Sequence, residues 1–256
     1  MRTRVRDGWR LAVGTLTILR VSPPSRVDRG TAGVSAVLAA LAFAPVSLLA
    51  GVVGWGLSVV LPGVVSALLV VGLVAWLTRA IHLDGLADTA DGLGSGRPAV
   101  RALEIMRRGD IGPMGVVTLI VVLGLQVASV AVLLGRPWGW LAVTLGLCAG
   151  RGALAIAARR GVTAARKDGL GAVFASSVPV PVAGIVWLVL AGVLVWASWL
   201  MGVPWWQGLL AAVAGAALAA YLVRRSGQRL GGITGDVLGA SIELAATGVL
   251  VVLAAA

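Results

Sequence analysis

Three aspartates lie close together in the segment 82–92, whose sequence is HLDGLADTADG. Asp84, Asp88 and Asp91 are separated by four and three positions, so a helix through this segment places all three on one face. Clustered carboxylate oxygens suit a hard divalent cation, Mg²⁺ or Mn²⁺, and such an ion also binds diphosphates. The segment therefore predicts an Mg²⁺ site at which the aspartates hold the metal and the metal neutralises a leaving phosphate.

Several arginines follow the aspartates, and they support two interpretations of the cluster. In one, their guanidinium groups hold substrate phosphates in a bidentate fashion. In the other, the aspartates form a solvated acidic helix end whose charge the arginines balance. The first is favoured, because aligned carboxylates beside a membrane are disfavoured by desolvation unless they bind something. The arginines in question are Arg97, Arg101, Arg107 and Arg108.

His82 and Asp110 lie at the two ends of this region, and each has a functional and a structural interpretation. His82 is the only histidine of the chain, and its ordinary pKa near neutrality suits a catalytic proton transfer. A structural histidine at a helix end fits equally well. Asp110 precedes Pro113, which makes it a candidate cap for a helix that begins there. The glycine-rich stretch 92–96 is either a phosphate-binding turn or a plain connector.

Two later segments add candidate substrate-binding residues. Lys167 lies in a basic, glycine-containing loop that is a candidate phosphate contact. Asp236 is a candidate N-cap of the last helix, and Glu243 lies seven positions later on the same helical face. A glutamate within an apolar helix is unfavourable in lipid, so it should face the bundle interior. We therefore expect Asp236 and Glu243 to form a second acidic wall that faces the aspartate cluster.

The elements that position these residues are predicted to be transmembrane helices. Hydrophobic residues make up 59% of the 256 residues and charged residues only 12%, too few to cover a water-soluble surface. The apolar residues come in runs long enough to cross a bilayer as helices. We predict an all-α integral membrane protein, a polytopic bundle of about seven helices. The predicted spans are 33–61, 64–80, 113–134, 138–158, 180–201, 206–223 and 237–256, the first with Pro45 as a point of tilt or breakage.

The charges between the spans predict the orientation of the protein in the membrane. Long charged connections alternate with short ones, and basic residues favour the cytoplasmic side. With the arginine-rich N-terminus inside, seven crossings place every long charged connection inside as well. We therefore predict a multi-pass protein of the cytoplasmic (inner) membrane with its active site facing the cytoplasm. An aromatic belt at the outer ends is expected from Trp138, Trp140, Trp199, Trp205 and Trp206.

The whole chain, 1–256, is predicted to form a single membrane domain whose main partner is the lipid bilayer. It has a basic interfacial segment at 1–30 and a cytoplasmic catalytic connection at 82–112. The net charge of +11 does not predict a nucleic-acid partner, because topology explains the basic residues. The sequence leaves the oligomeric state open, and a homo-oligomer is compatible with it.

Together these motifs resemble cobalamin synthase, the adenosylcobinamide-GDP ribazoletransferase family, over nearly the whole chain. Where members of that family often have Asp-Ser-Arg before the Ile-Gly pair, this chain has Arg108-Gly109-Asp110, and Ala246 stands where many have a second glutamate. The matching blocks are 82–92 (HLDGLADTADG), 103–107 (LEIMR), 111–115 (IGPMG), 169–171 with Phe174, and 235–240 (GDVLGA) with Glu243 and Leu244.

The resemblance implies a reaction. A nucleoside, α-ribazole or its 5′-phosphate, attacks adenosylcobinamide-GDP through its ribose 3′-hydroxyl, and GMP leaves. The resemblance also implies Mg²⁺ as the cofactor, adenosylcobalamin or its 5′-phosphate as the product, and a carboxylate that accepts the hydroxyl proton. Asp91 is one candidate for that proton acceptor.

Three alternatives remain at this point. A CDP-alcohol phosphatidyltransferase-like enzyme also joins an alcohol to a diphosphate-activated partner, but its motif has an Ala-Arg pair where Ala87 is here followed by Asp88. A transporter would place ionisable residues near the bilayer midplane, often in repeated halves. A non-catalytic membrane scaffold is the third alternative.

Overall fold

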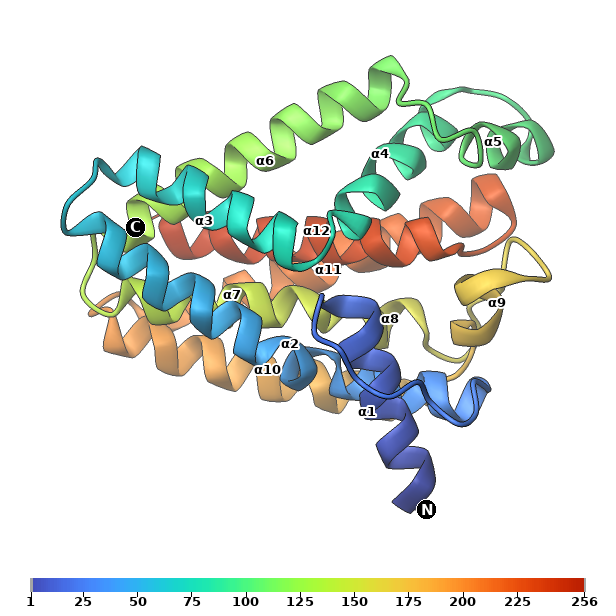
Figure 1. The fold of residues 1–256 in the computed structure, drawn as a ribbon, viewed down its shortest axis with the longest axis horizontal. Helices are drawn as coiled ribbons and strands as arrows, with labels where there is room; N and C mark the ends of the chain where they lie inside the picture. The colour runs from blue at the N-terminus through green and yellow to red at the C-terminus, as the bar shows by residue number, and fades with distance from the viewer. Residues whose placement is uncertain (1, 256) are drawn as a thin grey trace.

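The computed structural model describes residues 2–255, and these fold into α-helices with no strand among them (Figure 1). Within this part of the chain the helices are α1 (Arg2–Leu16), α2 (Arg29–Ser58), α3 (Gly63–Leu77), α4 (Ile81–Gly94), α5 (Ala99–Ile105), α6 (Pro113–Leu134), α7 (Gly139–Arg151), α8 (Ala153–Ala157), α9 (Gly169–Phe174), α10 (Val180–Leu200), α11 (Trp205–Leu230) and α12 (Gly235–Ala254).

In the part of the chain that the structure describes, 6 helices are long and apolar enough to cross a membrane, or 7 when α3 and α4 are counted as one bent span. The spans without a sharp bend are α2, α6, α7 together with α8, α10, α11 and α12. This confirms the prediction of a polytopic all-α bundle. Pro45 does not break α2, which is one continuous helix. The predicted end of the sixth span at 223 is wrong, because α11 continues through Arg224 and Arg225 to Leu230.

The predicted second span, 64–80, ends early and turns. Helix α3 stops at Leu77, and α4 leaves it at an angle of 91°. Arg79 and Ala80 between them have positive φ angles of 55° and 53°, which no right-handed helix accommodates. The aspartate segment is therefore not an extension of the second span. It is a separate helix, and Asp84, Asp88 and Asp91 all lie on it.

The connections divide between the two ends of the bundle. In Figure 1 the short connections and the C-terminus lie at the left, whereas α5, α9 and the long connections lie at the right. The carboxyl end of α10 and the amino end of α11, with Trp199 and Trp205, lie at the end with the short connections. This is the alternation that the charge pattern predicts. That the charged end faces the cytoplasm remains a prediction.

The N-terminal segment is a helix that packs on the bundle. Helix α1 buries Leu11, Val13 and Leu16 and lies against α2. Asp7 near its middle accepts hydrogen bonds from the hydroxyl and the N–H of Ser25, and these hydrogen bonds hold the pKa of Asp7 below its usual value. The same hydrogen bonds close the loop between α1 and α2, so α1 is fixed beside the start of the bundle.

Small residues let the buried helices approach one another closely. Helices α7, α8 and α12 are largely buried, whereas α6 and α10 expose most of their side chains. Gly150 on α7 lies against Ala246 on α12, and a Cβ atom at Gly150 would lie 2.9 Å from the Ala246 Cα. Gly150 therefore occupies a position where an added side chain would separate the two central helices.

We predict that Gly150→Ala lowers the stability of the protein by about 1–3 kcal/mol, because the added methyl overpacks the α7–α12 contact. Gly124 on α6 is the matched control, since a Cβ atom there would meet nothing within 4 Å. Gly124→Ala should leave stability unchanged or raise it slightly through helix propensity. Thermal unfolding in detergent micelles measures both, and equal melting temperatures for the two variants would contradict the packing argument.

Candidate functional site

The site begins at the contact between α4 and the first turns of α12. Gly85 on α4 lies against the backbone of Asp236, and a Cβ atom there would lie 2.8 Å from the Asp236 carbonyl oxygen. Gly239 on α12 packs in the same way against the backbone of His82. Glycine at both positions lets two helices that carry acidic residues meet backbone to backbone.

This contact brings together Asp84, Asp88 and Asp236, which we call the acidic cluster. Asp84 is exposed, and the other two are partly buried. The charges of Asp84 and Asp236, and more weakly that of Asp91, act on Asp88, and Arg166 opposes them. Two of the three aspartates of α4 therefore lie near Asp236. Of the two residues predicted to form the second acidic wall, Asp236 is the one that lies beside them.

Asp236 does not cap α12, as its position suggested. Thr234 is the N-cap, and its hydroxyl oxygen accepts from the N–H of Val237 at 3.3 Å. The same hydroxyl donates to Asp236 Oδ2 at 3.0 Å. Because Thr234 performs the capping, the Asp236 carboxylate is not used to cap its own helix.

Asp91 belongs to a different arrangement from Asp84 and Asp88. Its two carboxylate oxygens accept from the N–H groups of Gly112 at 2.7 Å and Gly115 at 2.9 Å, at the start of α6. Negative charge at a helix N-terminus is favourable, and these hydrogen bonds satisfy donors that the helix itself leaves open. Asp91 therefore fastens α4 to α6. The prediction that Asp110 caps this helix is wrong, because Asp91 does so from another helix.

The number and type of the donor atoms in the acidic cluster decide whether it suits Mg²⁺. Among residues 2–255 no group of three or more His, Cys, Asp or Glu side chains is arranged so that it could hold a metal ion together. Mg²⁺ usually takes only one or two carboxylates and fills its remaining positions with water and substrate phosphate oxygens. Asp84, Asp88 and Asp236 offer carboxylate oxygens from two helices, so one or two of them fit such an ion. The contacts of Asp91 do not favour a role as a further ligand.

Positive charge reaches the cluster from the loop between α8 and α9. Arg166 there donates to the carbonyl oxygen of Leu103 at 2.7 Å, which ties the loop to α5. Partial burial and the nearby charge of Arg107 hold the pKa of Arg166 below its usual value, while Asp236, Asp168 and Asp88 act in the opposite direction. Sequence reasoning missed Arg166, although its position beside the chosen Lys167 was a usable signal.

The arginines and the lysine that are predicted to bind phosphate lie at this same end of the bundle, and some of them are paired with carboxylates. Arg107 pairs with Asp168 at 3.4 Å, and Arg101 pairs with Glu104 at 2.6 Å. Arg97, Arg108 and Lys167 are exposed. The pairing of Arg101 matches the charge-balancing interpretation of the arginines. Arg166, in contrast, contacts α5 and interacts with the charges of the cluster.

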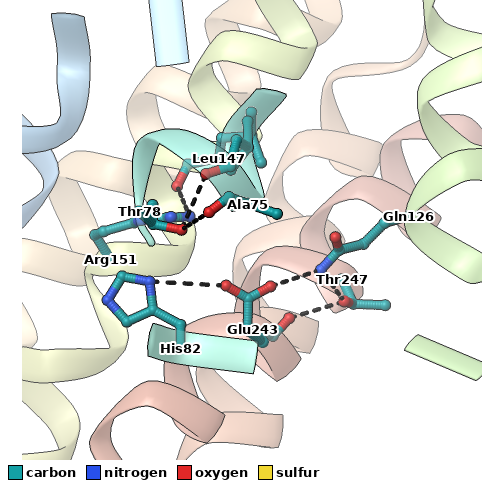
Figure 2. A network of polar contacts seen from close by, with 9 residues as sticks. Ala75, Thr78, His82, Gln126, Leu147, Arg151, Glu243 and Thr247 are labelled. Carbon is teal, nitrogen blue, oxygen red and sulfur yellow. Dashed lines mark hydrogen bonds and ion pairs between the residues drawn. The ribbon is translucent and has the colours of Figure 1, made fainter. Parts of the chain in front are cut away.

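Glu243 faces the bundle interior, as expected, but it does not join the acidic cluster. Figure 2 shows it at the centre of a buried network. Gln126 on α6 donates to Glu243 Oε2 at 2.9 Å and to the Thr247 hydroxyl at 3.0 Å. Nδ1 of His82 lies 3.9 Å from Glu243 Oε1. The predicted second acidic wall is therefore split, with Asp236 at the cluster and Glu243 in this deeper network.

The positive member of the network is Arg151 on α7, which is only 1% exposed. Its guanidinium carbon lies 3.4 Å from the centre of the Phe43 ring, and its Nη1 donates to the carbonyl oxygen of Leu147. Its charge interacts favourably with that of Glu243. Sequence reasoning missed Arg151, although a lone arginine within a predicted span, 138–158, is itself a signal of a buried charge pair.

We predict that Asp91→Asn and Asp88→Asn change stability in opposite directions. Asn at position 91 presents a single oxygen to two N–H donors, so the protein should lose about 1–3 kcal/mol of stability. Asn at position 88 removes a charge from a cluster of like charges, so stability should stay the same or rise. Thermal unfolding without substrate measures both, and a stable Asp91→Asn variant would refute the fastening role.

We also predict that Arg151 and Glu243 are coupled. Arg151→Met or Glu243→Gln alone leaves one charge without its partner in the bundle interior, and each should destabilise by about 3–5 kcal/mol. The double variant should be more stable than the sum of the two losses predicts, by about 0.5–3 kcal/mol. A double-mutant cycle of unfolding free energies measures this, and strictly additive losses would show that the charges act independently.

Comparison with known proteins identifies the family of the chain. The sequence profile of the family described as cobalamin-5-phosphate synthase matches residues 8–254. Relatives named adenosylcobinamide-GDP ribazoletransferase occur in Nocardioides sp. (45% identity over 98% of this chain and 100% of the relative), Frankia casuarinae (36%, 96% and 93%) and Sinorhizobium medicae (34%, 99% and 99%). No solved structure matches the chain significantly. The resemblance is confirmed, and the chain belongs to the cobalamin-5-phosphate synthase family.

Proposed function

We propose that this protein joins α-ribazole, or its 5′-phosphate, to adenosylcobinamide-GDP with release of GMP, forming adenosylcobalamin or its 5′-phosphate. The observation that carries the proposal is the acidic cluster, in which two helices present carboxylates beside Arg166 at the charged end of the bundle. The printed names of the relatives, adenosylcobinamide-GDP ribazoletransferase, support the substrates.

In the proposed reaction, the ribose 3′-hydroxyl oxygen bonds to the phosphorus on the cobinamide side of the diphosphate. The bond from that phosphorus to the bridging oxygen breaks, and GMP leaves with the electron pair. The hydroxyl proton passes to a carboxylate of the cluster. Asp84 and Asp88 suit this role better than Asp91, because both oxygens of Asp91 already accept backbone hydrogen bonds.

Mg²⁺, when held by one or two of the carboxylates of Asp84, Asp88 and Asp236, would supply positive charge to the diphosphate oxygens and the departing phosphate. The protein's own contribution is to bring the reactants together and to balance charge. Arg166, with Arg107 beside it, is placed to contact phosphate oxygens, and exposed Arg97, Arg108 and Lys167 add to the positive potential around them. Arg101, which pairs with Glu104, belongs to the same surface.

The proposed setting is the cytoplasmic membrane, with the acidic cluster on the cytoplasmic side. The apolar spans provide the attachment to the bilayer, and the charged connections at one end fit the excess of basic residues expected on the inner side.

The test is a GMP-release assay on the purified protein in lipid vesicles. We expect release to need both substrates and Mg²⁺, and to fall by roughly 100-fold or more in Asp84→Asn, because a carboxylate that holds the metal against the diphosphate is lost. Asp110→Asn, a change at an exposed carboxylate of the same surface, is the matched control and should keep full activity. Full turnover of Asp84→Asn, or Mg²⁺-independent release, would overturn the metal assignment. CMP release from a CDP-activated donor would favour the alternative transferase.

A further inference from the structure

A pocket lies beside the acidic cluster and has an apolar interior. Its volume is about 170 Å³, and it is enclosed by the end of α1, the bend between α3 and α4, α8, α9 and the start of α12. The buried side chains of its floor are at most 5% exposed. They are Leu16, Leu154, Phe174, Leu238 and Ile242, together with the one polar residue His82.

The rim of the pocket reaches the protein surface. Ile81 and Leu170 on this rim are 45% and 37% exposed, so a ligand can enter past them. Arg79, also on the rim, donates to the carbonyl oxygen of Gly14 at 3.0 Å, which joins the end of α1 to the α3–α4 bend. The positive-φ turn at Arg79 and Ala80 therefore forms part of the border of the pocket.

His82 makes the floor suitable for a nitrogen-containing ring. Its side chain is buried, and Nδ1 has no hydrogen-bond partner among the described residues, although it points towards Glu243. Figure 2 shows the other ring nitrogen on the opposite side of the imidazole, away from Glu243. A polar group on an otherwise apolar floor distinguishes a heterocycle from a hydrocarbon, because only the heterocycle can form a hydrogen bond with it.

The wall of the pocket adjoins two members of the acidic cluster along the chain. Ile81 and His82 lie one turn before Asp84 on α4, and Gly235 in the pocket wall immediately precedes Asp236. A molecule whose flat end fills the pocket therefore has its adjoining sugar next to the carboxylates. The pocket volume of about 170 Å³ is sufficient for an aromatic ring, because an apolar cavity of about 150 Å³ holds benzene.

We propose that this pocket binds the aromatic base of the nucleoside acceptor and so presents the ribose hydroxyl to the acidic cluster. The proposal rests on the function proposed above, since it names the subsite of one of the two substrates. The diphosphate donor is anionic and belongs with the arginines and carboxylates, whereas the base is flat and largely apolar. His82 then acts in base recognition rather than in proton transfer at the diphosphate.

The first test measures the binding of benzimidazole, a flat bicyclic ring that contains nitrogen, to the full-length protein in lipid vesicles by equilibrium dialysis. We expect saturable binding that Leu170→Trp weakens roughly tenfold by filling the entrance. Leu188→Trp is the matched control, because Leu188 is 73% exposed on α10 and lies outside the pocket. Absence of saturable binding, or equal binding by Leu170→Trp, overturns the proposal whether or not GMP is released.

The second test is kinetic. Benzimidazole should inhibit GMP release competitively with the acceptor nucleoside and not with the donor, and Leu170→Trp should raise the KM for the acceptor roughly tenfold with little change for the donor. Binding without such competition would show that the pocket holds another occupant, such as a lipid chain, and would overturn the assignment. Binding as expected in a wild type that releases no GMP would instead contradict the proposed function.

Discussion

The close contact of α4 with the first turns of α12 is the constraint on which the rest of the site depends. Gly85 and Gly239 allow the two backbones to meet, and a side chain at Gly85 would collide with the backbone of Asp236. Near this contact, Asp84 and Asp88 face Asp236, while His82 approaches Glu243. One helix pair therefore positions both the charged cluster at the end of the bundle and the buried network within it.

Much of this arrangement follows from the sequence, because it depends on local spacing. The apolar runs predict the spans, and the positions of Asp84 and Asp88 predict a shared helical face that the structure places beside Asp236. The roles of Asp91 and Asp110 were not accessible in that way. Asp91 caps α6 from 21 residues away in the chain, and such a long-range hydrogen bond leaves no mark in local spacing. The α3–α4 bend likewise depends on Arg79 and Ala80, neither of which is a typical residue for positive φ.

The buried network explains why a helix bundle of small apolar residues has a defined register. Van der Waals contacts between glycine and alanine surfaces are nearly equivalent when one helix slides along another, whereas hydrogen bonds between particular side chains are not. Gln126, Glu243 and Thr247 connect α6 to α12, and Arg151 adds α7 through its charge and its contact with Phe43 on α2. The central helices are therefore held at one relative height, which in turn fixes the acidic cluster relative to the loop that carries Arg166.

The bend before α4 has a consequence for how unlike substrates meet. A straight helix through 63–94 would extend about 48 Å, well beyond a hydrocarbon core of about 30 Å, and would carry the aspartates into water away from α12. Because the chain turns by 91° instead, α4 stays against the start of α12. Its first turn borders an apolar pocket and its next turns carry carboxylates. The reaction proposed above, between a diphosphate and a nucleoside with an apolar base, needs both environments close together, and α4 provides them on a single helix.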